Sequence, residues 1–285
     1  MRRLSAVVLG APLAVLLAAG VIVPAAIFLA YSFFGFSMYE IKPGFDVHWY
    51  RQILTGGVYG AVALNTLAIA VPTTLVSVIG GYAIAYYIVF AAGRSGRVIF
   101  MLVVVSLLAS YLARVYAWRT LMGSEGIVNT LLQSVGLIDQ PLEWLLFSRF
   151  PVILAEINLY MPVTALICYA GLVGVPPDVR EVARDLGAGP VRTLFRITLP
   201  ITGPALFAAA ALAFFLSCGD YITPAFLGGP TTGQTFGTII ANRITTEGNY
   251  PLSAALSFSM IAVFAIYIAV LFLGLRASRL LPRGA

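Results

Sequence analysis

Long apolar runs separated by short polar connections dominate the chain. Six of these runs reach the length of about 20 residues that a helix needs to cross a hydrocarbon core of about 30 Å. They are continuous rather than alternating, which favours transmembrane helices over the strands of a β-barrel. The sequence therefore predicts six spans, at Val7–Phe34, Tyr59–Phe90, Val98–Ala117, Phe150–Val173, Ile201–Thr223 and Leu252–Leu275.

Two of the runs are unusually long. The first follows Arg2 and Arg3 as the apolar core of a signal peptide would, but it continues to Phe34 and is too long for a cleaved segment. We expect it to be retained as the first helix. The second exceeds the length of a perpendicular span, so it is expected to tilt, to kink at Pro72 or to project beyond the bilayer.

Composition supports the same class. Of the 285 residues, 60% are hydrophobic and 10% are charged, and the mean hydropathy is +0.97, which indicates an integral membrane protein in a lipid bilayer. The predicted fold is all-α, a polytopic helix bundle forming one domain over 1–285, with a first helix and outer loop at 1–58 and a core bundle at 59–275. The net charge of +6 comes from arginines that flank apolar runs, so nucleic acid is not an expected partner.

The basic residues also predict the orientation. One set of alternate connections carries eleven arginines: Arg2, Arg3, Arg94, Arg97, Arg180, Arg184, Arg192, Arg196, Arg276, Arg279 and Arg283. The other set carries five basic residues, Lys42, Arg51, Arg119, Arg149 and Arg243, and most of the loop acids. Because basic residues concentrate on the cytoplasmic side, both termini are expected to be cytoplasmic.

The connections on the predicted outer side are longer and less regular. Between Trp118 and Arg149, glycines and Pro141 interrupt apolar pieces that are too short to cross, so these pieces are expected to lie at the interface or to dip into the bundle. Another outer turn is predicted at 228–233.

The sequence lacks the motifs of the common enzyme classes. The only lysine is Lys42, so the chain has no phosphate-binding loop of the GxxxxGK[ST] type, and HExxH, CxxC, GxSxG and paired histidines are absent. Cys168 and Cys218 lie inside apolar runs and are interpreted as packing residues. We expect neither an enzyme nor a metal site.

Three ionisable residues lie within predicted spans: Arg114, Glu156 and Asp220. Because such groups are costly in a membrane, they usually face a cavity or a partner. The alternating span directions place all three in the outer part of the membrane, close enough in depth to pair. Together with Tyr111, Tyr116, Tyr160 and Tyr221 they could line a polar pathway; alternatively, Arg114 and an acid form a structural ion pair, and the tyrosines belong to the interfacial belt.

The most polar stretch between apolar runs is Val175–Pro200, on the predicted cytoplasmic side. Pro176 and Pro177 end the preceding helix, and Asp178 and Glu181 place negative charge at a new helix N-terminus. Gly187, Gly189 and Pro190 predict a sharp turn before a second amphipathic helix, with apolar Leu194, Phe195 and Ile197. This helix-turn-helix segment is either a solvated loop or a docking element.

Here the residues resemble a known family. Glu181-Val182-Ala183, then Gly187, and later Phe195, Ile197, Leu199 and Pro200 are similar to the EAA loop of membrane subunits of bacterial ABC importers, with Val182 in place of the usual alanine. The resemblance implies a MetI-like permease fold in which this segment docks on a cytoplasmic ATPase subunit. The implied coupling residues are Asp178, Glu181, Ala183, Arg184, Asp185, Gly187 and Ala188.

Further stretches resemble the spermidine/putrescine branch of these permeases. They are 114–118, 136–138, 220–229 and 250–255. The resemblance implies a multi-pass subunit of the bacterial inner membrane, working with two ABC ATPases, a second and non-identical permease, and an extracytoplasmic solute-binding protein. ATP and Mg would be bound by the ATPases, with no cofactor in this chain.

A polyamine such as spermidine or putrescine is then the expected solute, since Glu156 and Asp220 suit a cation, although Arg114 counts against a purely cationic site. The alternatives are a permease for another small charged solute (an opine, an amino-acid derivative or an organophosphonate) and a stand-alone channel or secondary transporter. Such a stand-alone protein would have no reason to carry the coupling segment.

Overall fold

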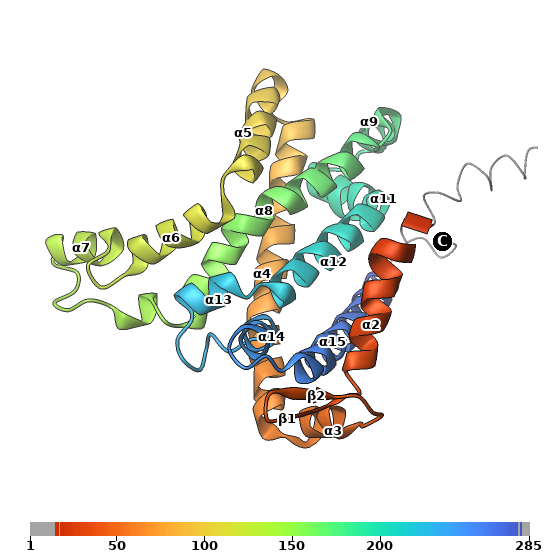
Figure 1. Ribbon diagram of the computed structural model, residues 1–285. Coiled ribbons are helices and arrows are strands. Elements are labelled where there is room, and N and C mark those ends of the chain that lie inside the picture. Colours follow the sequence, from red (N-terminus) through yellow and green to blue (C-terminus); the bar gives the residue numbers. More distant parts are fainter. Residues whose placement is uncertain (1–14, 17, 279, 281–285) are drawn as a thin grey trace, which may run out of the picture. The chain divides into compact units, whose positions relative to one another are not determined.

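Helices make up most of the described chain (Figure 1). The structure is a computed structural model that describes residues 15–16, 18–278 and 280. In order, the elements are α2 (Val23–Tyr31), β1 (Gly35–Ser37), β2 (Glu40–Lys42), α3 (His48–Thr55), α4 (Gly57–Phe90), α5 (Gly96–Leu108), α6 (Tyr111–Met122), α7 (Ile127–Ser134), α8 (Arg149–Val173), α9 (Pro177–Asp185), α10 (Pro190–Thr193), α11 (Leu199–Ile201), α12 (Gly203–Gly219), α13 (Ile222–Leu227), α14 (Phe236–Thr245) and α15 (Tyr250–Ala277). Short π-helical stretches cover Ala18–Ile22 and Leu194–Thr198, and 3-10 turns cover Gly93–Ser95 and Glu143–Leu145.

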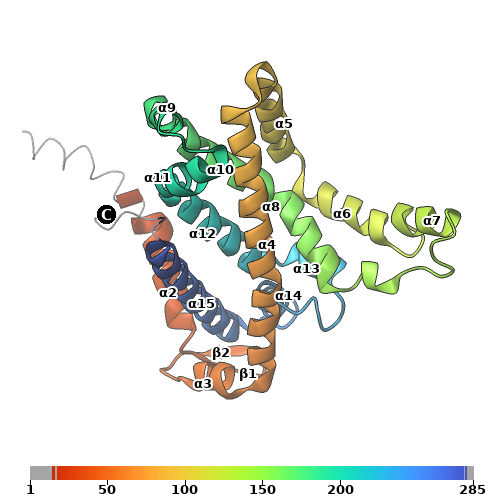
Figure 2. The same ribbon diagram turned by 180° about the vertical axis from the view of Figure 1, so that it is seen from behind.

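Among the described residues, three helical segments are long and apolar enough to cross a membrane: Gly57–Phe90, Glu143–Val173 and Tyr250–Ala277. They confirm the second, fourth and sixth predicted spans. Helix α4 has 34 residues with Pro72 inside it, and Figure 2 shows it as one continuous helix. At 1.5 Å per residue such a helix is about 50 Å long and exceeds the hydrocarbon core. The first predicted span, Val7–Phe34, lies partly outside the described residues.

The third and fifth predicted spans are not single straight helices. The chain bends by 93° between Gly93–Leu108 and Tyr111–Ser134, so a continuous helix over Val98–Ala117 is wrong. Ala109 and Ser110 are extended there, with ψ of 137° and 130°, which ends the hydrogen-bond ladder of α5. A second bend, of 72°, separates Pro190–Ile201 from Gly203–Gly219. Pro204, which lacks an N–H, stands in the first turn of α12.

By its contacts the described chain forms two compact units, one of residues up to Ala61 with Ile239–Ala262, and one of Val62–Thr238 with the residues from Val263 onward. In the first unit β1 and β2 form an antiparallel hairpin with Phe36 opposite Ile41. The Trp49 indole of α3 donates to the Phe34 carbonyl over 2.8 Å. Arg243 and Glu247 form an ion pair, and this hydrogen bond raises the pKa of Arg243. The sequence had placed 35–55 in an outer loop, and no helix was predicted at 236–245.

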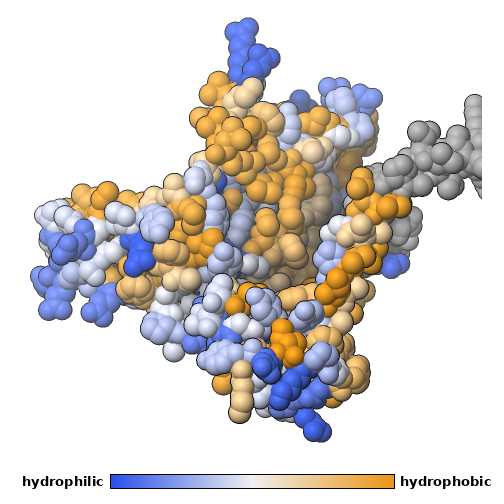
Figure 3. Space-filling model, viewed as in Figure 1, coloured by the Kyte–Doolittle hydropathy of each residue, from blue (hydrophilic) through white to orange (hydrophobic). Residues whose placement is uncertain are grey.

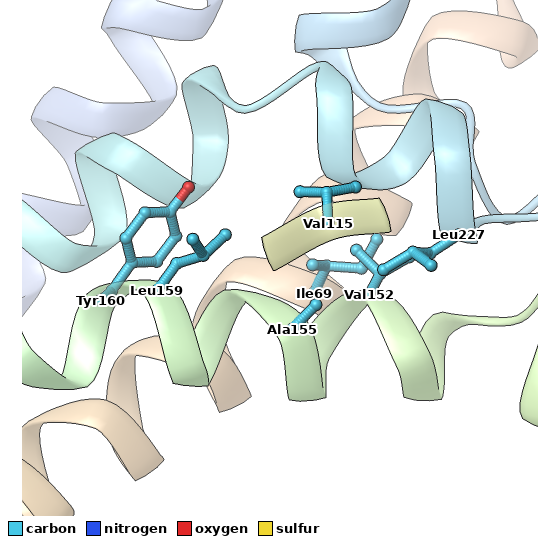
Figure 4. Packing of buried hydrophobic residues seen from close by; sticks show 7 residues of the cluster. All are labelled: Ile69, Val115, Val152, Ala155, Leu159, Tyr160 and Leu227. Atoms are coloured by element: carbon cyan, nitrogen blue, oxygen red, sulfur yellow. The ribbon is translucent and has the colours of Figure 1, made fainter. Parts of the chain in front are cut away.

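The second unit has its core where α4, α6, α8 and α13 meet. Figure 4 shows this cluster, in which Val152, Ala155, Leu159 and Tyr160 of α8 pack with Ile69, Val115 and Leu227. Helix α8 also packs along α12 and lies beside α4. Gly81 of α4 permits this approach, because a Cβ there would overlap the Thr164 hydroxyl of α8. Residues of α8 are thus fixed from several sides.

Large apolar side chains remain exposed on the helices that match predicted spans. On α5 they are Val98, Met101, Leu102, Val105 and Leu108, and Figure 3 shows the mostly hydrophobic surface there. A surface of this kind is stable against lipid tails or another apolar helix, but not in water.

Candidate functional site

The polar stretch Val175–Pro200, called the charged segment below, folds as the sequence predicts. Helix α9 begins at Pro177 with Asp178 in its first turn and ends at Asp185. The turn then requires Gly187, whose φ of +78° lies in the left-handed region. The amides of Gly187 and Ala188 donate to the carbonyls of Arg184 and Ala183, each over 2.9 Å, which caps the helix end. The helix-turn-helix interpretation is confirmed, and its docking role needs further evidence.

Few side chains of this segment are buried, and several large apolar ones are exposed. Ala183 of α9 and Thr193 of α10 are buried, at 5% and 7% exposure. In contrast, Val182, Leu186, Val191 and Phe195 are 55%, 82%, 66% and 62% exposed. The remaining predicted coupling residues lie in the same segment: Asp178, Glu181, Arg184 and Asp185 are exposed, and Ala188 is half-buried. An ordered apolar surface with a charged border is typical of a protein interface.

Arg180 connects α9 to the end of α4. Its guanidinium carbon lies 3.6 Å from the ring centroid of Phe90 and 5.9 Å from that of Tyr86. Sequence reasoning did not select Phe90, because an aromatic residue at the end of an apolar run looks like part of the interfacial belt. The contact attaches the charged segment to the longest helix of the chain.

A cavity of about 640 Å³ lies beside this contact. Its walls are the end of α4, with Tyr86 and Phe90, the end of α8, with Leu172 and Val173, and the α9–α10 segment, with Arg180 and Arg184. One half of the wall is therefore apolar and the other carries charge.

The predicted intramembrane residues only partly come together. Asp220 is buried, and its carboxylate accepts bonds from the hydroxyls of Tyr111 (2.5 Å), Tyr160 (3.0 Å) and Thr223 (2.6 Å). It also accepts from the amides of Ile222 (2.9 Å) and Thr223 (3.1 Å), which caps the start of α13. Asp220 therefore joins α6, α8 and α13.

Glu156 is fully buried one helical turn before Tyr160. Its Oε2 accepts a bond from the Ser217 hydroxyl of α12, while its Oε1 has no partner among the described residues. The buried hydroxyls of Thr73 and Ser77 on α4 also lack partners there. Sequence reasoning missed these hydroxyls, although their spacing of four residues directly after Pro72 places them on one face of α4.

Arg114 pairs with neither acid. Its Nη2 donates to the Ala109 carbonyl over 2.9 Å, at the bend between α5 and α6, and the ion pair found among the described residues is the one between Arg243 and Glu247. Tyr116 and Tyr221 are 51% and 49% exposed and lie outside the Asp220 network. The structure thus separates the predicted set into buried groups around Asp220 and Glu156, a half-buried Arg114, and two exposed tyrosines. Contact with solute stays a prediction for all of them.

Comparison with known proteins extends this geometry. Residues 89–284 match the family described as "Binding-protein-dependent transport system inner membrane component". The inner membrane ABC transporter permease protein YdcU of Escherichia coli is 28% identical over 84% of this chain and 79% of its own length. The spermidine/putrescine transport system permease protein PotB of Haemophilus influenzae is 28% identical over 79% and 77%.

A solved structure shares the fold. It is a bacterial alginate ABC transporter in complex with an alginate pentasaccharide-bound periplasmic protein, with a TM-score of 0.73, 19% identity, and coverage of 95% of this chain and 96% of that one. The matched family region contains α9 with its ordered apolar surface, as well as α8 and α12. The chain belongs to the family of inner-membrane components of binding-protein-dependent transport systems, the permease subunits of ABC importers.

Proposed function

We propose that this permease subunit conducts small organic cations of the polyamine class in a transporter with two ABC ATPases, one of which docks on α9. In this proposal the solute arrives on an extracytoplasmic solute-binding protein, and a second, non-identical permease completes the pathway. ATP and Mg are bound by the ATPases. The subunit lies in the inner membrane of a bacterium with both termini and α9 in the cytoplasm, as the distribution of arginines favours.

The observation that carries the docking role is the exposed apolar surface of Val182, Leu186, Val191 and Phe195. Exposing these side chains to water is unfavourable, by roughly 25 cal/mol for each Å² of apolar area. Gly187 and the capped end of α9 hold them in one ordered arrangement, so a partner need not order the segment when it binds.

The connections of α9 explain how docking could move the pathway. Helix α8 ends three residues before α9, and α10 and α11 lead directly into α12. A displacement of α9 by closing ATPases would therefore pull on both α8 and α12, the helices that carry Glu156 and Ser217. This is the arrangement that alternating access requires, with nucleotide binding favouring one of two states.

Support for a cationic solute comes from the buried carboxyl groups and from the relatives. Glu156 has an oxygen without a hydrogen-bond partner among the described residues, which an ammonium group could use if the helices part. PotB, one of the similar proteins, is named for spermidine and putrescine transport. Arg114 places a positive charge in the neighbouring α6, which keeps another small charged solute as the second candidate.

Reconstitution tests the proposal. The chain is co-expressed with the second permease and the ATPase. The purified complex is placed in vesicles with the solute-binding protein and supplied with labelled spermidine. We expect uptake that needs ATP and is competed by putrescine, but not by 2-aminoethylphosphonate or an amino acid. Uptake without the ATPase would support a channel or secondary transporter instead. Competition by the phosphonate alone would remove the polyamine assignment.

A further inference from the structure

The cavity behind α9 is the strongest unassigned feature of the second unit. We propose that it binds the phosphate headgroup of an anionic phospholipid from the cytoplasmic leaflet. Its volume of about 640 Å³ lies within the range of ligand pockets. The proposal goes beyond the transport function, since it requires no ATPase and no particular solute.

Position is the first argument. The cavity lies at the C-terminal ends of two candidate membrane spans, Gly57–Phe90 and Glu143–Val173. Because both segments are longer than the hydrocarbon core, their ends lie at or beyond its boundary, at the level of the headgroups. Phe90, Leu172 and Val173 supply an apolar wall for the start of an acyl chain. A ligand with one polar end and one apolar end fits a cavity with these two walls.

Charge is the second argument. Arg180 and Arg184 line the cavity together with Glu181, so its charged residues carry a net positive charge. Neither arginine forms an ion pair among the described residues, and the Arg180 Nε is buried there without a hydrogen-bond partner. A buried donor without an acceptor is costly, and a phosphate oxygen would satisfy it.

The contact with Phe90 holds the Arg180 guanidinium in the cavity wall, where it can bind a phosphate. A guanidinium held over the face of an aromatic ring makes this contact without an N–H···O hydrogen bond. The 3.6 Å separation from the Phe90 centroid therefore orients the group without using its donors. Basic pockets between membrane helices on the cytoplasmic side are suited to anionic headgroups.

The test is native mass spectrometry of the delipidated full chain, titrated with phosphatidylglycerol, phosphatidylethanolamine or soluble glycerol 3-phosphate. We expect preference for phosphatidylglycerol, and Arg180→Gln with Arg184→Gln should weaken it about tenfold per arginine. The matched control is Arg192→Gln with Arg196→Gln, which removes two exposed arginines of the same segment that do not line the cavity. This control should bind like the parent chain.

Three results would overturn the proposal. They are equal binding of the two phospholipids, an equal loss in the control pair, and binding of glycerol 3-phosphate as tight as that of the lipid, which would indicate a free phosphate compound. If the double variant Arg180→Gln with Arg184→Gln does not fold, Phe90→Leu replaces it in the test. This substitution keeps both arginine charges and removes the aromatic ring. It should lower phosphatidylglycerol binding several-fold, and unchanged binding would contradict the proposal.

Discussion

The guanidinium of Arg180 on α9 lies over the ring of Phe90 at the end of α4, 3.6 Å from its centroid. One residue belongs to the charged segment and the other to the longest helix of the chain. A cation over an aromatic ring contributes about 0.5–2 kcal/mol, depending on how far it is removed from water. The contact therefore links the orientation of α9 to the end of α4.

The first prediction concerns this contact. Phe90→Leu should leave assembly with the ATPase intact but lower transport per ATP hydrolysed several-fold, because α9 then moves without α4. Uptake and ATP hydrolysis are measured together in vesicles. Phe90→Tyr, which keeps a ring, serves as the control and should transport normally. Equal transport per ATP hydrolysed in the two variants would show that the contact does not couple α9 to α4.

The second prediction concerns the turn after α9. Gly187→Ala should cost about 1 kcal/mol and reduce uptake, because φ is +78° there and an L-residue is strained in that region. Nothing lies within 4 Å of a Cβ built at Gly187 or at Gly189. Gly189→Ala is thus a matched control with an ordinary φ of −68° and should behave like the parent. Uptake by the two variants is compared at equal membrane content, and equal effects would exclude a role for the left-handed turn.

The third prediction concerns Asp220. Asp220→Ala should lower the free energy of unfolding by roughly 3 kcal/mol, since buried hydroxyls and amides on three helices lose their acceptor. Thermal unfolding of the purified chain provides the measurement. Asp185→Ala, at an exposed position of α9, should change the unfolding temperature little. If both substitutions are equally mild, the Asp220 network does not hold the bundle together.

The fourth prediction concerns Glu156. Glu156→Gln keeps the shape and an acceptor for Ser217 but removes the ionisable carboxyl group that an entering ammonium group would meet, so it should abolish most uptake of a cationic solute without loss of assembly. Ser217→Ala removes the hydrogen bond and keeps the carboxyl group, and it should retain uptake. Labelled spermidine uptake is measured for both. Normal transport by Glu156→Gln would place Glu156 outside the pathway.

The sequence was sufficient for features set by local patterns. Hydropathy located the helices around Pro72 and Pro162, and the proline and glycine signals at Pro177 and Gly187 located the coupling segment. These features depend on neighbouring residues alone, which is why they could be predicted.

Features that depend on tertiary contacts were not predicted. The bend at Ala109 and Ser110 contains neither proline nor glycine, and the Arg114 side chain bonds to the carbonyl at that bend. The two tyrosines that bond Asp220 come from helices 109 and 60 residues away in sequence. Spacing along one chain does not show such partners.

Cross-linking from the exposed surface of α9 tests the central claim most directly. The described cysteines, Cys168 and Cys218, are buried, so a cysteine at Leu186, which is 82% exposed, can carry a photoreactive label. In membranes containing the whole transporter, labelled Leu186→Cys should cross-link to the ATPase. The control Leu54→Cys, 85% exposed on the side predicted to be extracytoplasmic, should not. Cross-linking from Leu54 but not from Leu186 would contradict the account.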